Sequence, residues 1–429
     1  MALKEGNSGA REPARTRGLD VFRNRNFRLL WFGAVASNVG TWIQQVAQGW
    51  LVITLTNSPG WLGAVALATS LPFLVVPLFG GVIADRVDRV KLLQITQTTS
   101  MVLAFTLAAL TIVGVVEVWQ IIVLAFLNST SNSFDQPTRN ALLPDMVREE
   151  ELMQAVSLQS TAFQGAALVG PAIAGVLVGV IGVGGCFLIN GVSFLFVIFA
   201  LTLMKVPQTK PAVLKPVVSD MLEGLSFLRR SSLLIAVLVL TSIFSIFGRS
   251  YSTLMPAIAK IELDLNSEAL GLMYAMPGLG TLVGGFALAA SGDIRRKGTL
   301  LTVTAVFTGA VLLALSLSTS LIVLLVMLVG VGVTTTVFNA TASTVLQINS
   351  PGNMRGRVMS FNTIAWRGFT PLGGALAGVL AQFFGTRFAI GSGGLVVLVA
   401  AIGLFVVLPY IRQADREADS VPASARTSA

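Results

Sequence analysis

Charged side chains of both signs stand together between Asp85 and Lys91 of this 429-residue chain. The run DRVDRVK carries five charges, although only 11% of all residues are charged and long apolar stretches flank the run. A turn between two apolar helices needs only lysine or arginine to fix its side of a membrane. The added acids therefore predict ion pairs that hold two parts of the molecule together in one state. The alternative is that these charges only set topology and solvate a turn.

Four further charged residues fall inside the apolar stretches: Asp135, Arg139, Arg249 and Arg367. Arg139 follows Asp135 by four residues, so the two lie on one helical face and are expected to pair. The two deep arginines have no acid at comparable depth. Because a buried arginine is costly without a partner, we expect an anionic or carbonyl-rich group between them. A substrate with carboxylate, catecholate or phenolate groups would fit, and so would helix carbonyls.

Polar residues recur at helical spacing in the same stretches. Stripes with spacings of 3, 4 and 3 residues are Asn38, Thr41, Gln45 and Gln48; Asn128, Ser131, Asp135 and Thr138; Ser242, Ser245, Arg249 and Ser252; and Ser360, Thr363, Arg367 and Thr370. Such stripes face either a wet cavity or another helix. For single hydroxyls, packing or a bond to the helix backbone is the plainer interpretation. The residues expected to line a substrate cavity are Asn38, Thr41, Gln45, Arg249, Asn339 and Arg367.

The chain lacks the residues and motifs that common enzymatic reactions use. It contains no histidine and a single cysteine, Cys186, so a zinc site, a cysteine cluster and a disulfide are not expected. The GxxxxGK[ST] phosphate loop, a nucleophile elbow and an intramembrane carboxylate pair are also missing from the sequence. We expect no enzyme activity, no cofactor, no metal and no ATP hydrolysis, which leaves an ion gradient or facilitated diffusion as the energy source for any transport.

The composition predicts a polytopic membrane protein. Hydrophobic residues make up 54% of the chain and the mean hydropathy is +0.80. Apolar runs of about 20 residues, without period-two alternation, predict spanning helices rather than a β-barrel. Twelve spans are expected, at 28–55, 60–84, 92–114, 118–139, 152–181, 185–204, 232–257, 269–290, 299–317, 320–347, 357–384 and 387–411.

The basic residues fix the expected orientation. The net charge is +9 and the sequence pI is near 10.3. Lysine and arginine gather in alternate loops and in both tails, whereas the intervening loops hold only Lys260 and Arg387. This distribution follows the positive-inside rule and predicts a multi-pass protein of the plasma (inner) membrane with both termini in the cytoplasm. Nucleic-acid binding is therefore not expected.

An internal repeat divides the chain into two similar halves. An offset of 204 residues maps Gly80 and Gly81 onto Gly284 and Gly285, and it maps the first polar stripe onto the stripe that contains Arg249. The expected fold is all-α, with twelve helices in two pseudo-symmetric halves. The expected parts are a disordered cytoplasmic tail at 1–27, six-helix bundles at 28–204 and 232–411, a cytoplasmic linker with an amphipathic helix at 205–231, and a disordered tail at 412–429.

Three motifs resemble the major facilitator superfamily. The loop motif of that superfamily, Gly, three residues, Asp, Arg, any residue, Gly and two basic residues, is similar to the segment from Gly81 through Asp85 and Arg86 to Lys91. Asp88 stands here at the second glycine and Val90 at the second basic position. GPAIAG, with Gly170, Pro171 and Gly175, resembles the motif of the antiporters in the superfamily. FDQPTRNALLPDMV, from Phe134, is similar to the branch of the enterobactin exporter and macrolide efflux pumps.

The resemblance implies a transporter with a conformational latch formed by Gly81, Asp85, Arg86, Arg89, Asp135 and Arg139. It implies that Asp85 docks near the start of the eleventh span and that Arg89 reaches Asp135. It also implies export of a siderophore-like anion or a lipophilic drug such as a macrolide, by a monomer that works by alternating access and proton antiport. An uptake carrier or an uncoupled facilitator is the alternative on this fold. A scaffold or sensor that had lost transport would not be expected to keep the latch and the stripes.

Overall fold

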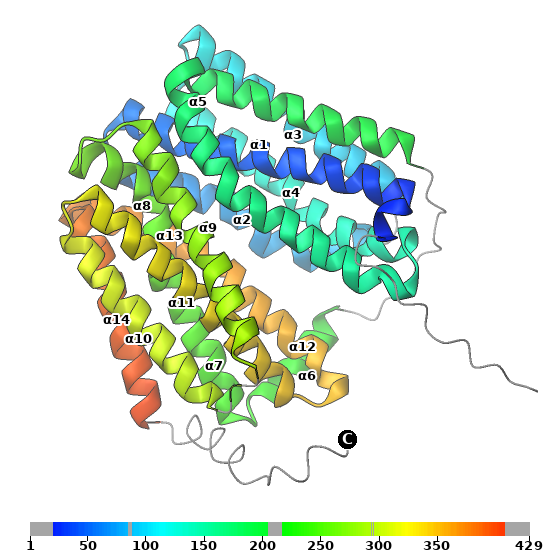
Figure 1. Cartoon of the computed structure of the whole chain (residues 1–429), viewed down its shortest axis with the longest axis vertical. Helices are drawn as coiled ribbons and strands as arrows, with labels where there is room; N and C mark the ends of the chain where they lie inside the picture. The colour runs from blue at the N-terminus through cyan, green and yellow to red at the C-terminus, as the bar shows by residue number, and fades with distance from the viewer. Residues whose placement is uncertain (1–19, 85–87, 205–216, 293, 295, 408–429) are drawn as a thin grey trace, which may run out of the picture.

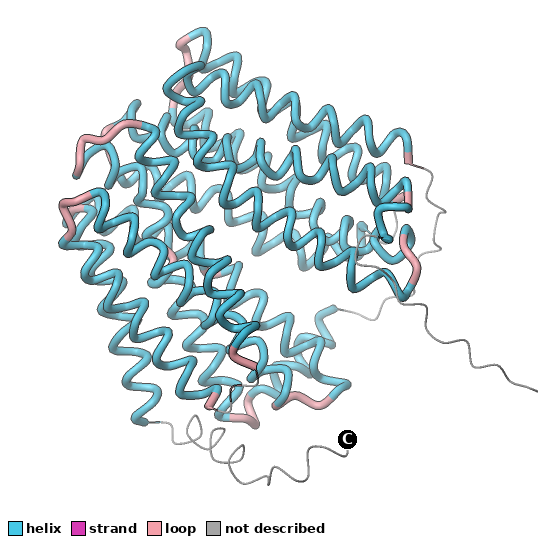
Figure 2. The backbone as a smooth tube through the Cα atoms, viewed as in Figure 1, coloured by secondary structure: helices cyan, strands magenta, loops and turns pink. Residues whose placement is uncertain are grey.

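The computed structural model describes residues 20–84, 88–204, 217–292, 294 and 296–407. Within them, the side chains of 74–84, Gln136 and 217–222 are left aside. Asp85 and Arg86 of the expected latch lie outside the described residues. All regular elements in the described ranges are helices, joined by short loops (Figure 2).

The first half of the chain contains two short helices and five long helical segments. These are η1 (Asp20–Arg23), α1 (Arg25–Thr56), α2 (Pro59–Ala84), α3 (Arg89–Val113), α4 (Val118–Met146), η2 (Glu149–Glu151) and α5 (Leu152–Leu203). α5 consists of two helices that meet at Gly182, whose φ of 72° and ψ of 173° are not helical. A glycine takes this positive φ without steric cost, so the chain turns back there within one residue.

The second half begins with the linker helix α6 (Val217–Leu228) and continues with six spans. Their elements are α7 (Ser232–Ile243), η3 (Phe244–Gly248), α8 (Tyr251–Ala257), η4 (Ile258–Glu262), α9 (Ser267–Ala290), α10 (Lys297–Leu317), α11 (Leu321–Ile348), α12 (Gly352–Thr363), η5 (Ile364–Gly368), α13 (Thr370–Phe384) and α14 (Thr386–Val407). The elements η3, η4 and η5 are π-helical turns. Residues 232–262 and 352–384 therefore each form one interrupted span.

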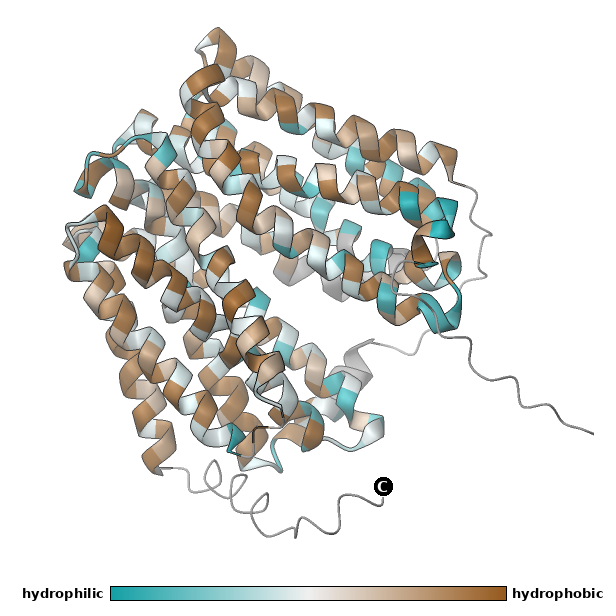
Figure 3. Ribbon diagram, in the orientation of Figure 1, coloured by the Kyte–Doolittle hydropathy of each residue, from teal (hydrophilic) through white to brown (hydrophobic). Residues whose placement is uncertain are grey.

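The expectation of twelve spans in two halves is confirmed. With α5 counted as two spans, six long segments lie on each side of residues 205–216. Seven helical stretches of the described chain are long and apolar enough to cross a membrane by length and composition, and one of these is the two-span stretch that includes α5. Much of the helix ribbon is coloured as hydrophobic (Figure 3), and many large hydrophobic side chains are exposed, as a lipid-facing surface requires.

Several helix ends differ from the expected boundaries, and for two of them the contacts give the reason. α1 begins at Arg25 rather than residue 28, because the Asn24 side chain accepts hydrogen bonds from the backbone N–H groups of Asn26 and Phe27 and caps the helix. Val21 of η1 is fully buried, so residues 20–27, which we expected within the N-terminal tail, are helical and packed in the structure. α4 continues past residue 139 to Met146 because its charged residues are paired within the bundle.

The two halves meet at one end of the molecule and diverge toward the other (Figure 1). Across the seam, α5 packs against α9 and α2 packs against α13. The close contacts come from residues 49–66 and 168–179 of the first half, and from 253–278 and 374–382 of the second. We call this the closed end. The opposite end, where α6 and the start of α12 lie, is called the open end.

Candidate functional site: the seam between the halves

Two π-helical turns place the two deep arginines. Arg249 directly follows η3, and Arg367 lies within η5, which contacts η3. A π turn widens the helix and leaves backbone carbonyls without their usual i+4 donors, and such turns are frequent at functional sites. At the start of α13 one more backbone carbonyl is left without a donor, because Pro371 has no N–H to donate to the preceding turn.

Arg249 is bound to the span that contains η5. One of its terminal nitrogens, Nη1, donates to the Trp366 carbonyl at 3.1 Å and to Thr370 Oγ1 at 2.9 Å. Its guanidinium carbon lies 4.9 Å from the centre of the Trp366 ring, a cation–π contact. Ser245 Oγ donates to the same carbonyl at 2.8 Å. Of the two partners expected for the deep arginines, a helix carbonyl is therefore the one that Arg249 uses.

An aromatic stack supports this contact from the other side. The ring of Phe244 lies parallel to that of Phe338 at a centroid distance of 4.2 Å, and 5.9 Å from that of Trp366. Phe244 and Phe338 are fully buried. The stack joins η3, α11 and η5 into one rigid unit, so it fixes both arginine-bearing turns. Asn339, expected in the cavity, follows Phe338 directly and is half-buried.

Arg367 differs from Arg249 in its surroundings. It is exposed, and no hydrogen-bond or ion-pair partner belongs to it among the described residues. Its turn, η5, contacts α2 of the other half. Arg367 therefore lies at the seam, near the middle of its span, with its charge unpaired by the described part of the protein.

The polar stripe on α1 lies on the face that meets the second half. Gly49 contacts Pro256 of α8, and Gln45 and Asn38 precede Gly49 by one and three helical turns, so they share its face. Gln45 and Thr41 are exposed and Asn38 is half-exposed. The structure therefore places the expected cavity residues of the two halves on surfaces that face the same seam.

The stripe on α4 turns toward another helix instead. Asp135 accepts hydrogen bonds from Gln97 Nε2 at 2.7 Å and from Arg139 Nε at 2.5 Å, and both residues of the ion pair are buried. Ser131 Oγ donates to the Thr96 carbonyl of α3 at 2.8 Å. Asp135 and Arg139 thus join α3 and α4 within one half, and sequence reasoning missed Gln97 as a partner.

One expected pairing of the latch is wrong. Arg89 Nη1 donates to Asp145 Oδ2 at 2.6 Å and to the Ala141 carbonyl at 2.9 Å, rather than reaching Asp135. The reason is that Arg89 starts α3 and therefore lies beside the last turn of the antiparallel α4. Asp88 caps α3, because its Oδ1 accepts from the backbone N–H of Val90 at 2.9 Å.

The antiporter-like motif lies where the halves approach most closely. A side chain on Gly170 would place Cβ 2.7 Å from Trp42 Cβ, and one on Gly175 would place it 3.0 Å from Gly271 Cα of α9. A Cβ on Gly271 would lie 2.5 Å from the Pro171 carbonyl oxygen. Only glycine permits these distances. Gly175 and the Pro171 carbonyl therefore form the α5–α9 crossing at the closed end, whereas Gly170 packs against α1 within the first half.

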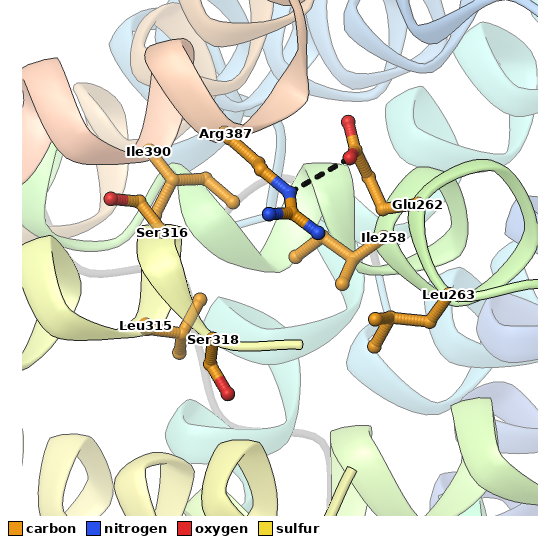
Figure 4. Close-up of a pocket in the computed structure, with 8 residues that line it drawn as sticks. All are labelled: Ile258, Glu262, Leu263, Leu315, Ser316, Ser318, Arg387 and Ile390. Carbon is orange, nitrogen blue, oxygen red and sulfur yellow. Dashed lines mark hydrogen bonds and ion pairs between the residues drawn. The ribbon is translucent and has the colours of Figure 1, made fainter. Parts of the chain in front are cut away.

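A small pocket opens near the outer ends of spans in the second half (Figure 4). Arg387 lies at its rim and donates from Nε to Glu262 Oε2 at 2.9 Å. The pair joins the end of η4 to the start of α14. Because Arg387 and Glu262 neutralise each other, they form a packing contact between two spans, and the pocket offers no unpaired charge to a ligand.

This architecture defines a class of protein. Two six-helix halves related by an internal repeat, joined across a seam at one end and carrying polar residues along it, are the arrangement of the major facilitator superfamily of transporters. The model of the transmembrane secretion effector family matches residues 16–426. The chain belongs to this family.

Relatives with curated names are transporters. The chain is 26% identical to the staphyloferrin A transporter of Staphylococcus aureus, with 81% of this chain and 87% of that protein covered. It is 23% identical to macrolide efflux protein A of Streptococcus pyogenes, with 90% of this chain and 96% of that protein covered. It is 22% identical to the enterobactin exporter EntS of Salmonella choleraesuis, with 90% of this chain and 93% of that protein covered. The resemblance to the enterobactin exporter and macrolide efflux branch is confirmed.

A solved structure shares the fold. A bacterial homologue of the lysosomal transporter Spinster, inward-facing and occupied, aligns with a TM-score of 0.69 at 13% identity, with 94% of this chain and 99% of that chain covered. The chain is thus a membrane transporter of the major facilitator fold with relatives that act in efflux. Its relatives imply a small-molecule substrate.

Proposed function

We propose that the chain exports a small organic molecule across the plasma membrane by alternating access, with proton antiport as the driving reaction. The observation that carries the proposal is the seam. Two crossings of small residues close one end, while a charged and polar surface faces the seam nearer the other. A substrate could enter from the open end, contact this surface and leave when the crossings part.

We place the open end in the cytoplasm. Support comes from the basic residues that gather there in the sequence, including Arg89, Arg355 and Arg357. Both chain termini would then also lie in the cytoplasm. The state captured by the structure would be the one that loads substrate from inside the cell, which is the state an exporter needs first. Asp85 and Arg86 are retained in the proposal as residues that dock when the open end closes.

Proton antiport is supported by the resemblance of the Gly170 segment to the motif of antiporters. The residue that would carry the proton is not assigned to Asp135. Its carboxylate accepts hydrogen bonds from Gln97 and Arg139 and thereby holds α3 and α4 together.

The test is transport in everted membrane vesicles, with a catecholate siderophore and then a macrolide, with and without a proton uncoupler. Vesicles from cells without the protein are the control. We expect accumulation that collapses with the uncoupler. Equilibration of the substrate that the uncoupler does not change would identify a facilitator. Accumulation only in right-side-out vesicles would identify an uptake carrier.

A further inference from the structure

The two deep arginines differ in what they contact, although both are arginines in π-interrupted spans of the same half. Arg249 donates to a backbone carbonyl and a hydroxyl and lies against the Trp366 ring. Arg367 is exposed and has no such partner in the described residues. A guanidinium that is held by a carbonyl, a hydroxyl and an aromatic ring is less available to a ligand than one without such partners, which keeps its planar set of donors.

The position of Arg367 is costly without a ligand or water. The residue lies near the middle of its span, and Arg249 lies close enough for the two positive charges to repel each other. Apart from Asp135, which pairs with Arg139, the acids of the described spanning helices lie in the first or last turn. The local excess of positive charge is therefore not neutralised by the described residues, and an arginine in such a place is by default functional.

The surroundings of Arg367 limit what can bind there. η5 contacts α2, and the face of α1 across the seam offers the neutral side chains of Asn38, Thr41 and Gln45. These can exchange hydrogen bonds with hydroxyl or amide groups but cannot balance a charge. The exposed ring of Phe73 on α2 provides apolar surface. Among the residues that the structure describes, the seam thus has one free cationic side chain, Arg367, with neutral polar and apolar surface around it.

We infer that Arg367 binds the carboxylate, or another planar anionic group, of the substrate, and that Arg249 positions it by fixing η5 to η3. The inference rests on the proposed function and adds to it the substrate class and a separate role for each arginine. A guanidinium can form two parallel hydrogen bonds with a carboxylate, which gives both strength and orientation. Arg249 contributes through the rigid turn on which Arg367 stands.

The experiment measures binding to purified protein in detergent, which requires no transport. The probes are 2,3-dihydroxybenzoate and its neutral amide, 2,3-dihydroxybenzamide, in a scintillation proximity assay. The variants are Arg367→Gln, Arg367→Lys and Arg249→Gln. Arg355→Gln is the matched control, because Arg355 is an exposed arginine at the start of the same span, three turns away from Arg367.

We expect the wild type and Arg355→Gln to prefer the benzoate. Arg367→Gln should weaken binding of the benzoate by about ten- to a hundredfold and change binding of the amide less than about threefold. Arg367→Lys should keep part of the preference, because the charge remains but the two parallel hydrogen bonds are lost. Arg249→Gln should lower the melting temperature and weaken the benzoate more than the amide, since the turn that carries Arg367 loses its anchor.

Three results would overturn the inference: a wild type without preference for the anion, an Arg367→Gln variant that weakens both probes equally, or an Arg249→Gln variant that selectively loses the benzoate at unchanged melting temperature. None of these results would contradict the proposed transport, because export of a neutral or cationic molecule could still be measured in the vesicles. A failure of the transport proposal would instead appear in the vesicles while the binding preference persisted.

Discussion

At the residue scale, the charged side chains of the first half act in pairs that join neighbouring helices. Asp135 with Arg139 and Gln97 fixes α4 to α3, and Arg89 with Asp145 repeats the arrangement nearer the open end. Two ionised groups in an apolar bundle remain tolerable only while each neutralises the other. These contacts give the first half the rigidity that a rocking unit needs.

A substitution in the Asp135 pair tests this role. Asp135→Asn leaves Arg139 buried without a counter-charge, which should reduce the free energy of unfolding by about 3–5 kcal/mol. Adding Arg139→Gln should restore part of the loss, because the orphaned charge is removed. Thermal unfolding in detergent, followed by tryptophan fluorescence, measures both variants. A double variant as unstable as the sum of the two single variants would show that the residues do not act as a pair.

Asp88 gives a second test at this scale. Its side chain caps α3, so Asp88→Ala should reduce stability by about 1 kcal/mol and Asp88→Ser should keep most of it. Thermal unfolding again provides the measurement. If Asp88→Gly, which restores the glycine of the superfamily motif, were more stable than the wild type, backbone freedom rather than capping would decide this position.

At the scale of elements, the closed end depends on two crossings without side chains between them. Gly175 meets Gly271 where α5 crosses α9, and Gly63 meets Gly378 where α2 crosses α13. In each crossing, the second span of one half packs against the fifth span of the other. Close backbone approach at small residues is a common way of packing membrane helices, and it can separate and re-form without breaking ion pairs.

Enlarging one crossing should shift the balance between states. A Cβ on Gly271 would lie 2.5 Å from the Pro171 carbonyl, whereas one on Gly285 of the same helix would meet nothing within 4 Å. We expect Gly271→Val to favour opening of this end and to slow transport at least tenfold, with Gly285→Val as the matched control. Labelling of single cysteines along α1 reports the state. Unchanged labelling in Gly271→Val would contradict the role of the crossing.

At the scale of the whole molecule, the proposed alternating access requires the closed end to open. Ser58 Oγ donates to Gln382 Oε1 at 2.5 Å, which links the start of α2 to the end of α13 across the halves. In a Cys186→Ser background, Ser58→Cys with Gln382→Cys should form a cross-link upon oxidation. Because the halves could then no longer part, transport should fall to background and recover upon reduction.

The single-cysteine variants are the controls, since neither can form the cross-link. Binding of substrate from the open end should survive in the cross-linked protein, because that end is unaffected. Transport that continued at the wild-type rate with the cross-link in place would show that the two halves do not need to separate there.

The sequence by itself determined the membrane class, the twelve helices, the two halves and the pairing of Asp135 with Arg139. These follow from hydropathy, from the repeat and from i to i+4 spacing, all of which are local in the chain. The family could also be predicted from the sequence, because its motifs are short and contiguous.

Only the tertiary structure decided which groups meet across helices. Arg89 pairs with Asp145 rather than Asp135 because the register of α3 against α4 brings those residues together, and no sequence pattern encodes that register. Likewise, the hydrogen bonds of Arg249 depend on a carbonyl that a π turn and Pro371 leave available in another span. The two arginines look alike in sequence but differ in their neighbours in space: Arg249 is bound to another span, whereas Arg367 has no hydrogen-bond or ion-pair partner among the described residues.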